Sequence, residues 1–323
     1  MKDRLFQVIE RLRITYLNNR TQFIIRCVVL LLVALLLVTK RTFWTPDTLF
    51  VILFSIFVVF GQVRPFLVRF LPLVSLLLLY ELFRGVADDL NGTVHFTEMI
   101  IADRWLFNGI IPSSVLQAWW WNGQVRWYDF YFYFLYTIHF LMPIILAVIL
   151  WKKADRFYWP FVWAIVGLSF AAFVTYIVFP AAPPWMAKEL GYFADPMHRV
   201  SSDIWAAMGI QNFSEVYNKL PANPVAAVPS LHSAYPLLFS LFVVLAFGRK
   251  YWWVFVYPIS MWVGVVYLGE HYVIDVILGA LYAGISVYAS LVFIAWYRRE
   301  LRKHPLRYVR SKLPSRIPYS TKA

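Results

Sequence analysis

Pro229-Ser230-Leu231-His232 and His271-Tyr272-Val273-Ile274-Asp275 are the two short stretches that decide how this chain folds and what it can do. A strongly apolar segment follows each stretch, so each is predicted to lie where a helix begins. Together they bring two histidines, a serine and a carboxylate to the starts of two helices. The rest of the sequence indicates whether those starts share one side of a membrane.

The composition indicates an integral membrane protein. Of the 323 residues, 61% are hydrophobic and only 15% are charged, whereas soluble globular proteins carry about 25% charged residues. Runs such as 23–38 and 281–296 approach the roughly 20 apolar residues that a membrane-spanning helix needs. We therefore expect an all-α fold, a polytopic bundle of transmembrane helices.

Eight apolar segments divide the chain, and each is predicted to span the membrane. They are 22–39, 47–63, 66–83, 130–151, 159–179, 232–247, 251–268 and 272–296. Because no repeat or flexible linker separates them, we expect a single transmembrane domain over 22–296. A basic segment at 1–21 precedes this domain, and a basic tail at 297–323 follows it.

The net charge of +13 gathers beside the apolar segments, where it is typical of cytoplasmic anchors attracted to anionic lipid and not of a nucleic-acid-binding surface. The positive-inside rule places both termini and the basic joints 152–156 and 249–250 in the cytoplasm. Eight spans satisfy this arrangement and leave one basic turn, Lys40-Arg41, outside. The long loops 84–129 and 180–231 are then predicted to lie outside the cell.

Ser230 and His232 are placed to handle an anion. Proline and serine are favoured where a helix starts, and a helix N-terminus offers unbonded N–H groups to a phosphate. Ser230 could add its hydroxyl, and His232, one turn further, could protonate a leaving oxygen. The alternative is a capped helix with a histidine at the membrane interface.

His271 and Asp275 are four residues apart, so on a helix they share one face. A carboxylate that accepts the Nδ1 proton of His271 would orient the ring and leave Nε2 free as a nucleophile. Ionisable groups in membrane helices usually mark function. The alternatives are a polar pair that joins two helices, or part of a proton relay.

The predicted topology lets the two stretches meet. Both helices start on the outer side, so His232 and His271 are expected to face each other across a gap the size of a phosphate, in one pocket. His139 lies within the fourth predicted span. We interpret it as a buried histidine bonded to a neighbouring helix, or as a contact behind the reacting groups.

Pro-Ser-x-His followed by His-x-x-x-Asp at a helix start resembles the type 2 phosphatidic acid phosphatase superfamily. The stretch 179–185 (Phe-Pro-Ala-Ala-Pro-Pro-Trp), together with Glu270-His271-Tyr272, is most similar to its inositol phosphorylceramide synthase-like branch. The resemblance covers about residues 80–296. It implies a six-helix catalytic core with a metal-independent site and no cofactor. His271 would be the nucleophile, His232 the acid, Asp275 the partner of His271, and Ser230 a phosphate contact.

Two phosphate-binding cations of the superfamily are missing here. Phe57 stands where the first motif has lysine, and Gly264-Val265 stands where the third motif begins Ser-Arg. Arg84, at the outer end of the third predicted span, is our first candidate to replace them, because arginine can bind a phosphate through two N–H groups. Its alternative role is a headgroup anchor. Arg104, Arg126 and Lys188 are weaker candidates.

These features predict a phosphohistidine enzyme that acts on membrane lipids at the extracytoplasmic face, in the plasma membrane. It would transfer phosphoinositol or a related headgroup to a lipid hydroxyl, or else hydrolyse a lipid phosphate with water. A proton-coupled transporter is the alternative from another class, but the polar residues cluster at one face and no inverted repeat is evident.

Overall fold

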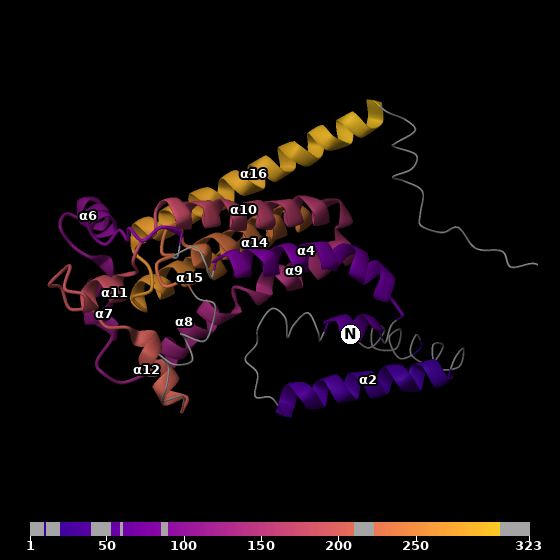
Figure 1. Cartoon of the computed structure of the whole chain (residues 1–323), viewed down its shortest axis with the longest axis horizontal. Helices are drawn as coiled ribbons and strands as arrows, with labels where there is room; N and C mark the ends of the chain where they lie inside the picture. The colour runs from indigo at the N-terminus through magenta and orange to yellow at the C-terminus, as the bar shows by residue number, and fades with distance from the viewer. Residues whose placement is uncertain are drawn as a thin grey trace, which may run out of the picture.

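The computed structural model describes residue 10 and residues 20–39, 53–58, 61–84, 90–209 and 223–303. Over these residues the regular structure is helical, which confirms the predicted all-α class (Figure 1). Isolated bridges of His95 to Ala181 and of Ala181 to Ala226 tie loops together without forming a strand. Most of the predicted basic segments 1–21 and 297–323 lies outside the described residues. Their predicted inner boundaries, at 21/22 and 296/297, fall within the helices Arg20–Thr39 and Val273–Lys303.

Long helices match the predicted apolar segments. They are α2 (Arg20–Thr39), α4 (Val63–Arg84), α8 (Trp127–Ile138), α9 (Leu141–Lys153), α10 (Tyr158–Val178), α14 (Leu231–Phe247), α15 (Val256–Tyr267) and α16 (Val273–Lys303). Of the predicted span 47–63, only part lies within the described residues. Shorter helices follow the predicted loops: α6 (Thr97–Leu106), α7 (Pro112–Trp120), α11 (Pro184–Glu189), α12 (Val200–Ala207) and the 3₁₀ segments η1 (Asp155–Phe157) and η2 (Arg249–Phe255).

Three helical segments within the described residues are long and apolar enough to cross a membrane: Val63–Tyr80, Asp155–Val178 and Val273–Glu300. Helices α8 and α9 pass the same test as a pair, bent by 57° between them. The outward face of α16 carries exposed apolar residues at helical spacing, namely Leu281, Ile285, Tyr288 and Val292. Such a stripe suits lipid contact, and the chain is an integral membrane protein.

The core lies between α10, α14 and α16, with α4 packed on α10 and α15 packed on α14. Apolar side chains that are fully buried, such as Phe161, Leu168 and Phe242, fill it. Because α14 and α16 start near each other, the two motif-bearing stretches come to the same end of the bundle.

Gly279 sets how closely α16 approaches the start of α14. A Cβ atom placed on Gly279 would lie 2.3 Å from the Ser230 carbonyl oxygen. Only glycine permits this approach without a shift of the backbone. One turn before this contact, the Ser230 N–H donates to the Asp275 carbonyl oxygen at 3.1 Å.

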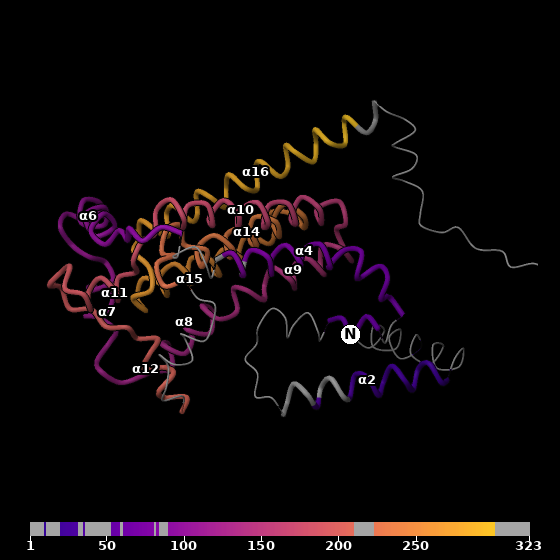
Figure 2. Tube along the Cα trace, viewed as in Figure 1, coloured from indigo at the N-terminus to yellow at the C-terminus, as the bar shows by residue number. Residues whose placement is uncertain are grey.

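The two ends of the bundle differ in character. At one end, α6, α7, α11 and α12 gather over the starts of α14 and α16, and we call this the loop end (Figures 1 and 2). Large exposed tryptophans lie there, including Trp105, Trp119 and Trp127. At the opposite, basic end, the Arg298 guanidinium donates to the Arg156 carbonyl oxygen at 3.0 Å.

Candidate active site

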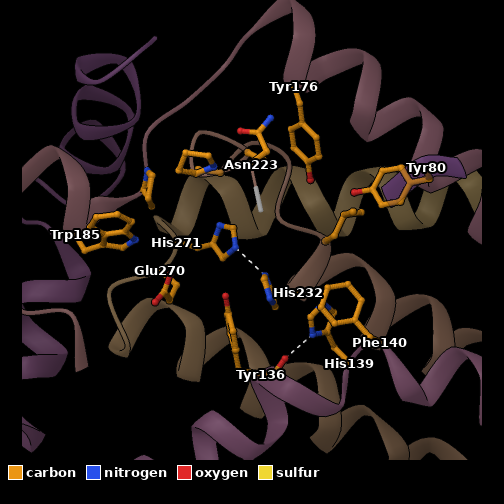
Figure 3. A pocket seen from close by; sticks show the side chains of 15 residues that line it. Tyr80, Tyr136, His139, Phe140, Tyr176, Trp185, Asn223, His232, Glu270 and His271 are labelled. Carbon is orange, nitrogen blue, oxygen red and sulfur yellow. Dashed lines mark hydrogen bonds between the residues drawn. The ribbon is translucent and has the colours of Figure 1, made fainter. Parts of the chain in front are cut away.

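His232 and His271 meet at the loop end. The Nδ1 atom of His232 lies 3.0 Å from Nε2 of His271, within hydrogen-bond distance (Figure 3). The predicted proximity is therefore observed, but the predicted phosphate-sized gap between the rings is closed by direct contact. A phosphorus atom can enter only when the two nitrogens separate.

Asp275 lies behind His271. Its Oδ2 atom is 3.4 Å from Nδ1 of His271 and accepts the Tyr272 N–H at 2.9 Å. The longer contact is within ion-pair range but lacks hydrogen-bond geometry, so His271 Nδ1 has no hydrogen-bond partner within the described residues. His271 precedes the first residue of α16, Val273. The two groups therefore meet across the helix start, and not on one helical face as the spacing predicted.

Ser230 is the N-cap of α14. Its Oγ atom accepts the Ser233 N–H at 3.2 Å, and the side chain is fully buried. This bond uses the oxygen as an acceptor and leaves the hydroxyl hydrogen for another partner. Contact between Ser230 and a phosphate stays a prediction.

The ring of His232 is held by stacking. Tyr136 stacks on it at a centroid distance of 4.1 Å, and His139 lies at the same distance on a tilted plane. His139 occupies the break between α8 and α9, where its Nδ1 atom bonds the Tyr136 carbonyl oxygen at 2.5 Å. This bond is made within its own helix turn. The predicted burial of His139 is observed, at 1% exposure, and its bond to a neighbouring helix stays a prediction.

A cavity opens beside the two rings, with an empty volume of about 600 Å³ including its open mouth. The lining includes both histidines and is otherwise mainly aromatic and polar: Tyr80, Tyr136, His139, Phe140, Tyr176, Trp185, Asn223 and Glu270 (Figure 3). The described lining contains no lysine or arginine.

Asp103 of α6 holds the start of α16 and was not identified from the sequence. Its two carboxylate oxygens accept the N–H groups of Ile274 at 2.9 Å and Val273 at 3.0 Å. The side chain is fully buried, and burial raises the pKa of Asp103 to about 6, while the two backbone bonds lower it. A carboxylate from a distant segment thus supplies the acceptors that this helix start needs.

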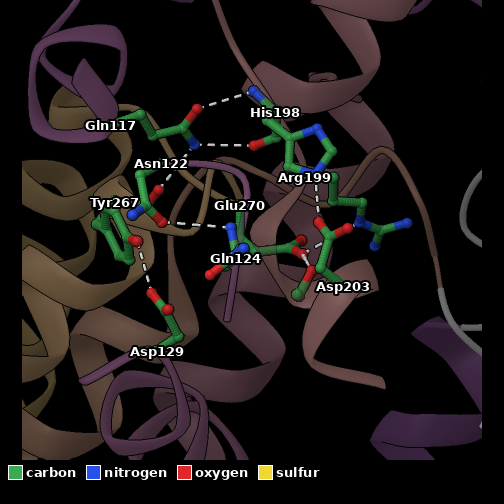
Figure 4. A network of polar contacts seen from close by, with 10 residues as sticks. Gln117, Asn122, Gln124, Asp129, His198, Arg199, Asp203, Tyr267 and Glu270 are labelled. Carbon is green, nitrogen blue, oxygen red and sulfur yellow. Dashed lines mark hydrogen bonds and ion pairs between the residues drawn. The ribbon is translucent and has the colours of Figure 1, made fainter. Parts of the chain in front are cut away.

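A polar network joins the remaining loop-end segments (Figure 4). The Gln117 amide nitrogen donates to the carbonyl oxygens of His198 and Tyr267, both at 2.8 Å, and its oxygen accepts the His198 N–H. The Tyr267 hydroxyl donates to buried Asp129 at 2.5 Å. These bonds fix the segment before α12 against the end of α15, two residues before Glu270-His271.

Arg199 is the cation that the sequence analysis missed. Its Nε atom lies 3.2 Å from Glu270 Oε1, and its guanidinium lies 3.9 Å from the centre of the Trp185 ring. Glu270 and Trp185 both line the cavity. A lone arginine in a proline-rich loop carries no local signal of this placement.

The four candidate cations from the sequence analysis have other positions. The side chain of Arg84, which ends α4, lies outside the described part of the chain. Arg104 pairs with Asp195 at 2.7 Å, and Lys188 donates to the Ala194 carbonyl oxygen at 2.9 Å. Arg126 caps α8. Among the described lining residues of the cavity, Arg104, Arg126 and Lys188 are absent.

Comparison with known proteins identifies the family. The family model of the PAP2 superfamily, the type 2 phosphatidic acid phosphatases, matches residues 97–289, and the chain belongs to this superfamily. The matched range includes both histidines, Asp275, the whole of α14 and the first part of α16. The superfamily predicted from the sequence is confirmed.

A curated relative narrows the comparison. The chain is 30% identical over 149 residues to a phosphoinositol dihydroceramide synthase of Bacteroides thetaiotaomicron. The match covers 43% of this chain and 47% of that protein, so the chain spans about half the length of this relative. This agrees with the predicted inositol phosphorylceramide synthase-like branch and with a PAP2-type lipid phosphatase or phosphotransferase. No solved structure matches the chain significantly.

Proposed function

We propose that this protein is an integral membrane phosphotransferase that takes phosphoinositol, or a related phospho-headgroup, from a phospholipid and passes it to a lipid hydroxyl. The reaction proceeds through a phosphohistidine on His271. The observation that carries the proposal is the 3.0 Å contact between His232 and His271 inside the loop-end cavity. A nucleophile and a proton donor so close together suit a two-step displacement.

In the first step, Nε2 of His271 attacks phosphorus. The N–P bond forms while the bond from phosphorus to the diacylglycerol oxygen breaks. His232 delivers a proton to that departing oxygen, so diacylglycerol leaves as a neutral alcohol. The headgroup remains joined to His271 through phosphorus.

In the second step, the acceptor hydroxyl attacks the same phosphorus. His232 now takes the proton of that hydroxyl, a new O–P bond forms, and the N–P bond breaks. His271 returns to its starting state. In the alternative reaction the donor is a lipid phosphate and the acceptor is water. The same two steps then release inorganic phosphate, which makes the protein a lipid-phosphate phosphatase.

The remaining site residues have supporting roles in the proposal. Asp275, 3.4 Å from Nδ1 of His271, stabilises the positive charge that the ring gains during attack. Ser230 offers its hydroxyl hydrogen to a phosphate oxygen. Arg84, from the end of α4, supplies a cation to the same phosphate. Burial of Asp275 and His271, at 0% and 5% exposure, strengthens these electrostatic effects.

The loop end is proposed to face the extracytoplasmic side of the plasma membrane. Support comes from the basic residues near Arg156, Arg249 and Arg298, which lie at the basic end. By the positive-inside rule that end is cytoplasmic, together with both termini, whose basic residues contact anionic lipids. The single catalytic domain covers 22–296 with eight spans, six of which form the superfamily core.

Transfer is favoured over hydrolysis by the match to a protein named phosphoinositol dihydroceramide synthase. The deciding experiment incubates the purified full-length protein with labelled phosphatidylinositol and either ceramide or diacylglycerol. A new labelled phosphodiester lipid supports transfer, whereas release of the free phospho-headgroup supports hydrolysis. Flux across liposomes carried out by a His271→Ala variant would instead favour transport.

Substitution of either histidine tests the mechanism directly. His232→Ala should lower turnover by about 10²–10⁴-fold through loss of general acid–base catalysis, and His271→Ala should lower it at least as much. A His95→Ala variant is the control, because His95 lies outside the cavity lining and pairs with Glu98. Purified, folded His271→Ala protein with full activity would show that another group is the nucleophile.

A further inference from the structure

We infer that Glu270 and Trp185, braced by Arg199 and Ser201, form a wall that recognises the hydroxyl groups of a polyol headgroup. This inference rests on the proposed function. It assigns selection of the headgroup to residues other than His232, His271, Asp275 and Ser230. We call Glu270, Trp185, Arg199 and Ser201 the headgroup wall. The argument begins with where the wall lies.

The headgroup wall borders the reacting nitrogen. Glu270 is adjacent to His271 in the chain, and both Glu270 and Trp185 line the cavity (Figure 3). The Trp185 N–H also donates to the Gly269 carbonyl oxygen at 3.2 Å through the backbone, which ties α11 to the turn before His271. A headgroup attached to phosphorus at His271 therefore lies within reach of this wall.

The wall is rigid and electrically balanced. Glu270 Oε1 accepts bonds from Arg199 Nε at 3.2 Å and from the Ser201 hydroxyl at 2.5 Å (Figure 4). The side chains of Arg199 and Glu270 are only 11% and 8% exposed. Arg199 also covers one face of Trp185. Because its positive charge offsets that of the carboxylate, the wall presents polar groups without net charge.

The polar atoms that remain on the wall match a hydroxyl group. Both bonds to Glu270 end on Oε1, so Oε2 retains its capacity to accept. Trp185 Nε1 is buried and has no hydrogen-bond partner among the described residues. The same is true of the amide nitrogen of Asn223, another lining residue. Buried donors without partners are costly in a folded protein, which points to a ligand oxygen. A hydroxyl donates to the carboxylate and accepts from the indole.

The same arrangement disfavours the other common headgroups. A quaternary ammonium binds best against an aromatic face beside an unpaired carboxylate. The headgroup wall does not offer this pair, because Arg199 covers one face of Trp185 and pairs with Glu270. A phosphate monoester dianion would place a second negative charge near Glu270, in a described lining without lysine or arginine. A phosphodiester with a polyhydroxylated headgroup avoids both conflicts.

The test compares donors that differ only in headgroup: phosphatidylinositol, phosphatidylglycerol, phosphatidylcholine and phosphatidic acid. Trp185→Phe keeps the stacked ring and removes only the N–H, and Glu270→Gln keeps the shape of the side chain. Each should lower kcat/KM for the two polyol donors by about 10-fold, and change that for the other donors by less than about 2-fold. The matched controls are Trp252→Phe and Glu189→Gln, which alter exposed side chains.

A binding arm separates this inference from the proposed function. Full-length His271→Ala protein in nanodiscs is loaded with an equal mixture of phosphatidylinositol and phosphatidylcholine, and retained lipid is measured by native mass spectrometry. Enrichment of phosphatidylinositol that is lost on adding Trp185→Phe supports the wall, whether or not turnover is ever seen. Equal retention of both lipids, or equal loss of kcat/KM for all four donors, overturns it.

Discussion

The starts of α14 and α16 carry His232 and His271, the two proposed catalytic residues, yet they are stabilised in different ways. The start of α14 is capped by its own chain, through the bond from the Ser233 N–H to Ser230 Oγ. The start of α16 depends on Asp103, which belongs to α6 and accepts two of its N–H groups. The position of His232 is therefore a local property, whereas that of His271 depends on a distant segment. The two histidines can be disturbed separately.

Gly279→Ala should disturb the starts of α14 and α16 together, because Gly279 lies where the two helices touch. The new Cβ would lie 2.3 Å from the Ser230 carbonyl oxygen, and such overpacking against backbone costs about 3 kcal/mol or more. The thermal unfolding temperature of the purified protein and its turnover rate should both fall. Gly284→Ala on the same helix is the control, since nothing lies within 4 Å of its Cβ. Equal behaviour of the two variants would contradict the close packing of α14 and α16.

Asp103→Asn should affect the start of α16 alone, in a pH-dependent way. Burial raises the pKa of Asp103 to about 6, above the value of 3.8 for the unfolded chain. The resulting contribution to the free energy of unfolding is fully present below about pH 4 and is lost as pH rises through 6. It amounts to up to about 3 kcal/mol. Between pH 4 and pH 7, the free energy of unfolding of the wild type should therefore fall by more than that of the variant.

The comparison protein for this pH experiment is Asp195→Asn. Asp195 is a partly exposed carboxylate that pairs with Arg104. Its variant should keep the pH dependence of the wild type. A parallel pH response in wild type and Asp103→Asn would show that Asp103 does not titrate in this range.

Ser230→Ala should have the smallest effect on stability, about 1 kcal/mol, because it removes one N-cap. The kinetic readout sharpens the comparison. If Ser230 also contacts phosphate, kcat/KM should fall by about 10-fold while the variant stays folded. Ser290→Ala is the control, since its hydroxyl donates to the Val287 carbonyl oxygen within α16 at 2.8 Å. A loss of stability without a kinetic change would limit Ser230 to capping.

Local patterns were sufficient for the helices and for the meeting of the motifs. Apolar runs predicted the long helices, and Pro229-Ser230 predicted the start of α14, where Ser230 is the N-cap. The charge pattern predicted that His232 and His271 lie at one end, where they are in contact. Each of these inferences depends on a periodicity or on charges near the segment concerned.

Long-range polar contacts could not be predicted in this way. Asp103, Gln117 and Arg199 bond partners 71 or more positions away, and no periodic pattern marks these contacts. The predicted span 130–151 proved to be two helices, broken where His139 bonds a carbonyl of its own turn. A break of this kind is stabilised by contacts around His232, which the segment's own composition does not reveal.

The two imidazoles bond each other directly, so no space for a phosphate remains between their facing nitrogens. When His232 Nδ1 carries the hydrogen of this bond, it engages the Nε2 lone pair of His271. Releasing the bond costs about 0.5–1.5 kcal/mol, and an oxygen of the arriving lipid can return that amount by bonding His232. In the proposed mechanism, the phosphate of the lipid must therefore displace this contact before His271 Nε2 can attack.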